Sequence, residues 1–189
     1  MSEQGGMVVS DTDADAEDPS GDWGRFEGRV VAEWLDDGRD MRLVEPFTYV
    51  DAAVVSWPAP ADSVVNGASI PRAFWSVIGG PFAGRFRNAS VVHDVACVAR
   101  TRPWREVHRM FYEACRCAGA PLVKSKVMYY AVYHFGPRWQ PAGRGFRDET
   151  PPPPTAADVA RVVQFFTTHD VPAAEVPTLS LSGNRPELR

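Results

Sequence analysis

The second half of the chain carries hydrophobic patterns with the period of an α-helix. After Pro103, the apolar positions recur at intervals of three and four residues and share one face, and Gly119 marks the end of that helix. Similar signals predict a short helix over 72–78, a nearly all-apolar helix over 89–100 capped by Asn88, and a helix from Pro121 to about Phe135.

Residues 26–65 instead carry short runs of strand-forming residues separated by turn signals. Asp37-Gly38 is a typical hairpin turn. The order of strands followed by helices indicates an α+β fold, with a short antiparallel β-meander followed by three to four packed helices. The predicted strands occupy 26–35, 41–44, 47–50, 53–57 and 64–65.

The two ends of the chain differ in composition from a single domain predicted over 23–139. Residues 1–22 are acidic and poor in large apolar groups, which predicts a disordered tail. Residues 140–154 end in four prolines and are typical of a stiff linker.

An appended amphipathic helix is predicted over 155–170, because a possible capping box at Thr155 and Asp158 precedes an apolar stripe. A helix this short is marginal alone, so it must dock on the domain, on a second copy or on a protein partner. The tail 171–189 is predicted to be disordered. The stripe consists of Val159, Val162, Val163 and Phe166.

The net charge of −4 hides an uneven distribution. Residues 1–22 carry −7, residues 23–139 carry +4, and residues 140–189 carry −1. Residues 72–116 contain eight arginines and only three acidic residues, and aromatic residues are interspersed among them. This favours an anionic small molecule or polymer as ligand. Nucleic-acid binding is a weaker hypothesis, since surface arginines over an aromatic core are the commoner case.

The sequence also gives an expectation for the cellular location of the protein. No window approaches the roughly 20 apolar residues of a transmembrane helix, and no basic start followed by an apolar run marks a secretory signal. The cysteines are Cys97, Cys115 and Cys117, an odd number with no redox or zinc-knuckle spacing. We expect reduced thiols in a cytoplasmic protein without membrane association.

The helix predicted over 89–100 places His93 and Asp94 in an apolar setting. A buried carboxylate must meet a metal, a cation or several hydrogen-bond donors, and a structural pair with an arginine would satisfy it equally well. His108 lies at the edge of the next helix's apolar face. It is suited either to a cleft or to a partly exposed surface.

The loop 66–72 is the second candidate site. Its small residues allow close approach of a ligand, and free N–H groups at the following helix start favour an anion. Arg72 opposes the helix dipole there, which suggests that it binds a carboxylate or another anion. We therefore predict Asn66, Ser69 and Arg72 as substrate-binding residues, with a purely structural turn as the alternative.

In their order and spacing these motifs resemble the domain-of-unknown-function family numbered 1353. The resemblance covers about 26–139 and implies a protein type found in phages, prophages and bacteria, without a settled activity. Family members usually have Asp in place of Asn66 and an acid near His108. The matching residues are 66–72, Trp75, Gly79, 81–82, 89–94, 109–111 and Gly119.

The family pattern implies a site for a divalent metal or an acid–base pair. In this chain His93, Asp94 and His108 would hold zinc or a similar ion, and His93 and Asp94 would be catalytic. The leading hypothesis is a small metal-assisted hydrolase acting on an anionic substrate. The alternative is a non-catalytic, phage-related binding or assembly module, with a structural His–Asp network and a protein partner or second copy docked on 155–170.

Overall fold

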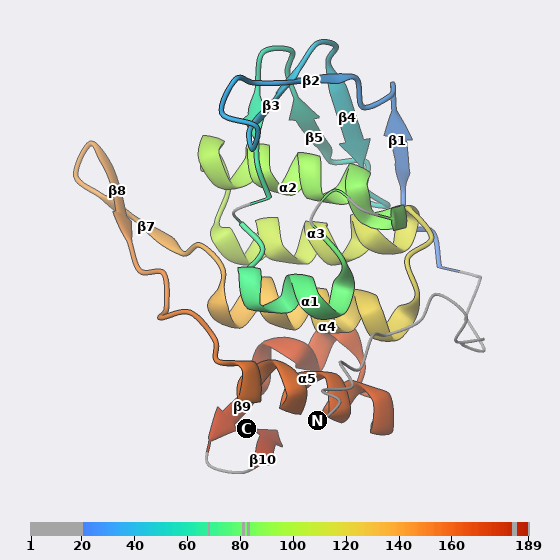
Figure 1. Ribbon diagram of the computed structural model, residues 1–189, viewed down its shortest axis with the longest axis vertical. Coiled ribbons are helices and arrows are strands. Elements are labelled where there is room, and N and C mark those ends of the chain that lie inside the picture. Colours follow the sequence, from blue (N-terminus) through green and yellow to red (C-terminus); the bar gives the residue numbers. More distant parts are fainter. Residues whose placement is uncertain (1–20, 68, 81, 83, 183–184, 189) are drawn as a thin grey trace, which may run out of the picture.

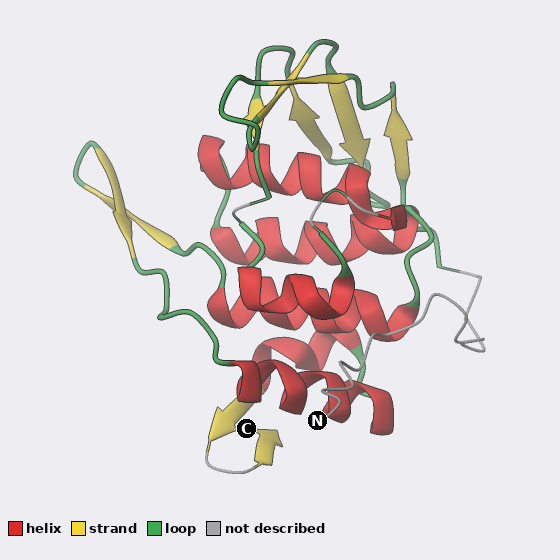
Figure 2. Cartoon of the chain, viewed as in Figure 1, coloured by secondary structure: helices red, strands yellow, loops and turns green. Residues whose placement is uncertain are grey.

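A computed structural model describes residues 21–67, 69–80, 82, 84–182 and 185–188. The predicted disordered tail, 1–22, lies outside the described residues except for its last two positions. The strands of residues 25–65 gather at one end of the molecule, and the helices lie beyond them in successive layers (Figures 1 and 2). The predicted α+β fold is confirmed.

The strands form two three-stranded antiparallel sheets where the sequence predicted one meander. The predicted strand over 26–35 is interrupted at Gly28, whose φ of 85° is incompatible with extended backbone. The chain therefore leaves the first sheet and enters the second. The first sheet pairs β1 (Arg25–Glu27), β4 (Phe47–Val50) and β5 (Ser56–Ala59), and the second pairs β2 (Ala32–Trp34), β3 (Met41–Leu43) and β6 (Val64–Val65).

The predicted helices of the domain are all present among the described residues. They are η1 (Arg72–Phe74) with α1 (Trp75–Ile78), η2 (Gly84–Phe86) with α2 (Arg87–Ala99), α3 (Trp104–Cys117) and α4 (Leu122–Phe135). Asn88 is not the cap of α2, because η2 runs directly into the helix and places Asn88 in its first turn. Within the described part of the chain, every helix is too short or too polar to cross a membrane.

Helix α2 lies between the sheets and α3 (Figure 1). Strands β4 to β6 cover one side of it and α3 covers another, so that Ala89, Val91 and Val92 are completely buried. This agrees with the expectation that an almost wholly apolar helix belongs in the interior. It also places His93 and Asp94 in the core.

A β-hairpin occupies much of 140–154, the segment predicted to be a Pro-rich linker. It pairs β7 (Trp139–Ala142) with β8 (Gly145–Asp148) through a tight turn, in which Gly143 has a φ of 58°. Trp139 is buried at its base and donates from Nε1 to the Arg102 carbonyl at 3.2 Å. Both strands beyond this tryptophan are exposed, and they contain proline, glycine and charged residues, a composition that resembles a linker.

Helix α5 (Ala156–Thr168) docks on the domain through the predicted apolar stripe. The capping box is present: Thr155 Oγ1 accepts from the Asp158 N–H at 3.2 Å, and Asp158 Oδ2 accepts from the Thr155 N–H at 2.8 Å. The four stripe residues are buried, and α5 contacts α4 and η1. The apolar stripe is therefore buried within the chain itself, without a second copy or a protein partner.

The tail predicted to be disordered over 171–189 contains ordered elements. They are η3 (Ala173–Thr178) and the pair of strands β9 (Leu179–Ser182) and β10 (Arg185–Leu188). Val176 and Leu179 are buried, so a few apolar residues hold this segment against the domain, although the sequence predicted a disordered tail. The Val176 carbonyl accepts from Nε2 of the partly buried His134 at 2.9 Å, which ties this segment to α4.

Acidification is expected to loosen this C-terminal packing through His134. Burial, aided by the Arg138 charge, lowers the pKa of His134 from 6.5 to about 4. The unfolded chain therefore binds more protons than the folded chain between these values, and stability is lost as the pH falls through this window. The loss approaches about 3 kcal/mol below the window.

Urea unfolding at pH 7 and pH 4.5, in the wild type and in His134→Gln, measures this contribution. The wild type should be the more stable protein at pH 7, and its advantage should shrink or reverse at pH 4.5. A constant difference between the two proteins would show that His134 does not titrate in this window.

Candidate functional site

Helices α2 and α3 bring His93 and His108 into direct contact. His93 Nε2 lies 2.9 Å from His108 Nδ1, and both side chains are completely buried. The partly exposed surface position considered for His108 is wrong, because the rings of Trp104, Tyr133 and Trp139 pack around it. The two histidines that the sequence singled out therefore form one buried group.

Cys97 joins this group from the next turn of α2. Its Sγ lies 3.7 Å from His93 Nε2, and one ligand atom each from His93, Cys97 and His108 all lie within 4.8 Å of one another. Cys97 was not among the metal ligands predicted from the sequence. The available signal was its spacing from His93, because residues four apart lie on the same helix face.

The outward-facing nitrogens of both rings have defined partners. His108 Nε2 lies 2.9 Å from the Pro137 carbonyl oxygen, and His93 Nδ1 lies 3.0 Å from Ser69 Oγ. A carbonyl oxygen only accepts, so His108 Nε2 carries the hydrogen and the neutral ring presents its Nδ1 lone pair to His93. Such outer partners orient the ring nitrogens in metal sites.

Asp94 faces the loop and takes no part in this group. Its Oδ2 accepts from the backbone N–H groups of Asn66 at 3.1 Å and Gly67 at 2.5 Å, and its Oδ1 accepts from the Ser69 hydroxyl. Successive helix residues point about 100° apart, which separates Asp94 from His93. The structure thus places Asp94 as the anchor of the loop, where the sequence predicted a metal ligand.

The contacts of Ser69 link the loop to the histidines, and their directions depend on what lies between the rings. Without an ion, His93 Nε2 donates to His108 Nδ1, and the single Ser69 hydroxyl hydrogen then has two acceptors to serve, His93 Nδ1 and Asp94 Oδ1. With an ion, both facing nitrogens offer lone pairs to it, His93 Nδ1 donates to Ser69, and the hydroxyl donates to Asp94. The second arrangement satisfies an ionised Asp94 and both rings together.

Burial sets the protonation of the group. It lowers the pKa of His93, with a further contribution from the His108 charge, and it lowers the pKa of His108 to about 3. Both rings are therefore neutral, the form that binds a metal ion. Burial also raises the pKa of the Cys97 thiol and that of Asp94, the latter against the hydrogen bonds from the loop. A nearby cation would favour the Cys97 thiolate.

A cavity of about 360 Å³ lies beside the group. Cys97 lines it, and so do Ser69 and Pro137, the residues that hold the outward nitrogens of the two histidines. The cavity therefore gives a small molecule access to the group from the side of Cys97. Its other lining residues are Val64, Asn66, Asp94, Val98 and Arg100.

The loop residues predicted to bind substrate separate in the structure. Asn66 and Ser69 line the cavity, and the Asn66 amide also donates to Asp40 Oδ1 at 3.2 Å. Arg72 is exposed, and its guanidinium lies 5.5 Å from the Trp75 ring centroid, away from the residues that line the cavity. Because η1 buries Phe74, Arg72 falls on the solvent side of that turn.

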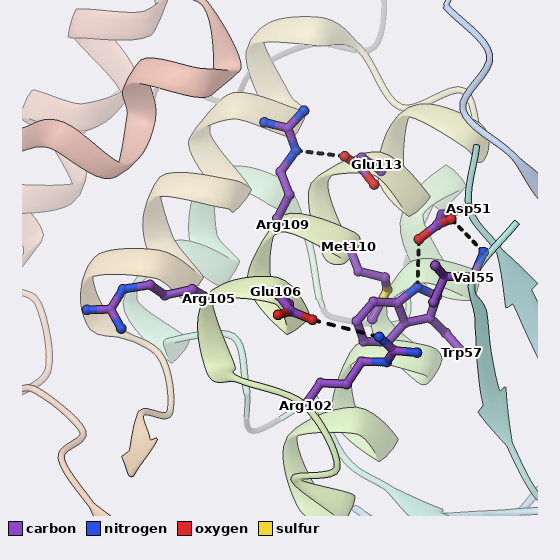
Figure 3. A pocket seen from close by; sticks show the side chains of 9 residues that line it. All are labelled: Asp51, Val55, Trp57, Arg102, Arg105, Glu106, Arg109, Met110 and Glu113. Carbon is purple, nitrogen blue, oxygen red and sulfur yellow. Dashed lines mark hydrogen bonds and ion pairs between the residues drawn. The ribbon is translucent and has the colours of Figure 1, made fainter. Parts of the chain in front are cut away.

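A second cavity, of about 320 Å³, lies along α3 and contains part of the arginine-rich stretch (Figure 3). Figure 3 shows the guanidinium groups of Arg102, Arg105 and Arg109 pointing in different directions. Arg102 lies 3.8 Å from Glu106, and Arg109 lies 2.7 Å from Glu113. Two of the three arginines that line this cavity are therefore paired with acidic side chains, and the three guanidinium groups do not converge on one point.

Two known proteins resemble part of this chain. "Uncharacterized protein y4jT" of Sinorhizobium fredii is 41% identical over 119 residues, which cover 62% of this chain and 35% of that relative. "Uncharacterized protein y4iH" of the same organism is 38% identical over 103 residues, or 54% of this chain and 43% of that relative. The chain thus spans less than half the length of either relative.

No solved structure matches the chain significantly. The family resemblance inferred from the motifs was expected over about 26–139, and it is supported over part of that range. Residues 41–132, which include the loop at 66–70 and the group of His93, Cys97 and His108, match the family described as "Protein of unknown function (DUF1353)".

Proposed function

We propose that this chain is a small metal-assisted hydrolase in which His93, Cys97 and His108 hold a zinc-type ion and act on an anionic substrate. One observation carries the proposal. Two buried, neutral imidazoles face each other at 2.9 Å while their outward nitrogens are held by Ser69 and Pro137. This arrangement orients metal ligands and is more than a packed core requires.

The dimensions of the group suit a tetrahedral ion. Zinc–nitrogen bonds near 2.0–2.1 Å would separate the facing histidine nitrogens by about 3.3 Å, a few tenths of an ångström more than the observed contact. A thiolate with two imidazoles favours zinc over the hard ions that prefer oxygen. The role of metal ligand therefore passes from Asp94 to Cys97, with Asp94 acting through Ser69.

Three protein ligands leave a fourth position for water or substrate, which is the pattern of catalytic zinc sites. The ion would polarise a carbonyl or phosphoryl oxygen and lower the pKa of a water molecule. The cavity beside Cys97 would bring the substrate to that position. Ser69 and Asp94 would fix the orientation of the His93 ring.

A cysteine nucleophile is the second candidate, because Cys97 Sγ lies 3.7 Å from His93 Nε2. In that mechanism His93 would remove the thiol proton. His93 Nε2 is already paired with His108 Nδ1, and burial raises the pKa of the thiol. Both features oppose a thiolate unless a cation is present, so the metal-assisted mechanism is favoured.

Metal analysis of protein purified without a chelating tag tests the proposal. We expect about one equivalent of zinc or a similar ion per chain. We also expect hydrolysis of p-nitrophenyl phosphate or p-nitrophenyl hydrogen succinate, lost after chelation and restored by added zinc. Cys97→Ser should lower both metal content and hydrolysis.

Protein that lacks metal, keeps its melting temperature after chelation and gains no activity with added zinc would contradict the proposal. The alternative of a non-catalytic, phage-related module with a structural His–Asp network would then stand. A metal-free protein whose hydrolysis is abolished by thiol alkylation would instead indicate the cysteine nucleophile.

A further inference from the structure

We infer that Arg100 is the anion-binding residue of the cavity beside His93, Cys97 and His108, and that its ligand is a small molecule with one oxyanion group and an apolar body. The inference deepens the proposed function and rests on it for the chemistry performed. The binding of the anion can be measured separately from the metal. Arg100 takes the anion-binding role that the sequence suggested for Arg72, which lies away from the cavity.

The position of Arg100 at the end of α2 brings it to the cavity beside the metal group. Arg100 follows Cys97 by three residues and caps the helix with a φ of 51°, in the left-handed region that often ends helices. Its side chain lines the same cavity as Cys97.

Aromatic rings hold the Arg100 guanidinium in place. Its Cζ lies 5.6 Å from the Trp139 ring centroid and 5.9 Å from that of Phe146, both on the β7–β8 hairpin. Contacts of this kind fix the orientation of the guanidinium plane and leave its N–H groups for an acceptor. The hairpin that the sequence did not predict is therefore part of the ligand site.

Asp148 occupies an N–H group of Arg100 and is easily displaced. Its carboxylate lies 2.7 Å from Arg100 Nη2, but the Asp148 side chain is 65% exposed while that of Arg100 is 26% exposed. Exposed ion pairs of this type contribute little free energy. A ligand carboxylate or phosphate can bind the remaining N–H groups or take the place of Asp148, in the two-point geometry that guanidinium favours.

The remaining walls of the cavity define the rest of the ligand. Val64 and Val98 line it and are 43% and 77% exposed, so apolar surface is available to a ligand at the mouth. Asp94 is committed to the loop N–H groups, which leaves Arg100 as the charge offered by the described lining residues. A volume of about 360 Å³ accommodates a small molecule, and the anionic polymer considered from the sequence is not favoured.

Binding of phenyl phosphate and benzoate to the full chain tests the inference. Calorimetry or amide chemical shifts would be recorded for protein as purified and after chelation, with phenol as the uncharged comparison. We expect Arg100→Gln to weaken binding of at least one anion by about tenfold. Asp148→Asn should strengthen it by a few fold, and neither change should alter metal content.

Arg102→Gln is the matched control, because it removes the same charge two residues away, from a side chain that lines the other cavity. It should leave anion binding within about twofold of the wild type. Equal weakening by Arg100→Gln and Arg102→Gln, equal binding of phenol and the anions, or no saturable binding up to about 10 mM would overturn the inference. Failure of the metal assay with Arg100-dependent anion binding retained would overturn the proposed function alone.

Discussion

Asp94→Asn is expected to lower the free energy of unfolding by about 3 kcal/mol, the largest stability effect that the site predicts. The Asp94 side chain is buried and accepts from the backbone N–H groups of Asn66 and Gly67 and from the Ser69 hydroxyl. An amide of the same size has only one acceptor oxygen. The Asn66 and Gly67 N–H groups would then donate to a neutral oxygen in place of a charged one, which weakens each bond, and the Ser69 hydroxyl would have to turn to accept from the new NH₂ group. Urea unfolding at pH 7 measures the change.

Ser69→Ala is the matched control for this substitution. It removes the hydroxyl that contacts Asp94 and His93 but leaves the loop N–H groups bound to the carboxylate. Its cost should be nearer 1 kcal/mol. If Asp94→Asn cost no more than Ser69→Ala, the carboxylate would not be what anchors the loop to α2.

The parts of the fold that the sequence predicted correctly are those in which local pattern and burial agree. Helix α3 has one clean apolar face between Pro103 and Gly119, and its bounds match the expectation closely. The β7–β8 hairpin and the segment 171–180 were missed because each is held by a few residues that pack against the domain. Trp139 and Val176 are buried within segments that are interrupted by proline.

The candidate site was predicted in part for a similar reason. His93 and Asp94 stood out as polar residues in an apolar helix, and burial confirms that both need partners. Which partner each has depends on the packing of α2 against α3 and against the loop, which the sequence pattern does not contain. Cys97 was passed over because a buried cysteine usually behaves as an ordinary apolar residue.

His108→Phe is expected to weaken zinc binding by at least about 100-fold, because it removes one of three ligands. The aromatic ring keeps the contacts with Trp104, Tyr133 and Trp139, so the metal-free protein should remain folded. Its unfolding free energy should fall by about 2 to 3 kcal/mol, since two bonds are lost, one to the Pro137 carbonyl and one to His93 Nε2. Competition with a chromogenic chelator measures zinc affinity, and urea unfolding measures stability.

His134→Phe provides the matched control, since His134 is a partly buried histidine whose Nε2 also donates to a backbone carbonyl, that of Val176. It should lose a comparable hydrogen bond while leaving zinc affinity within about threefold of the wild type, because it lies outside the metal group. A similar loss of affinity in both variants would trace the effect to general destabilisation. Unchanged zinc affinity in His108→Phe would remove His108 from the ligand set and leave His93 and Cys97 without the third donor that a catalytic zinc site requires.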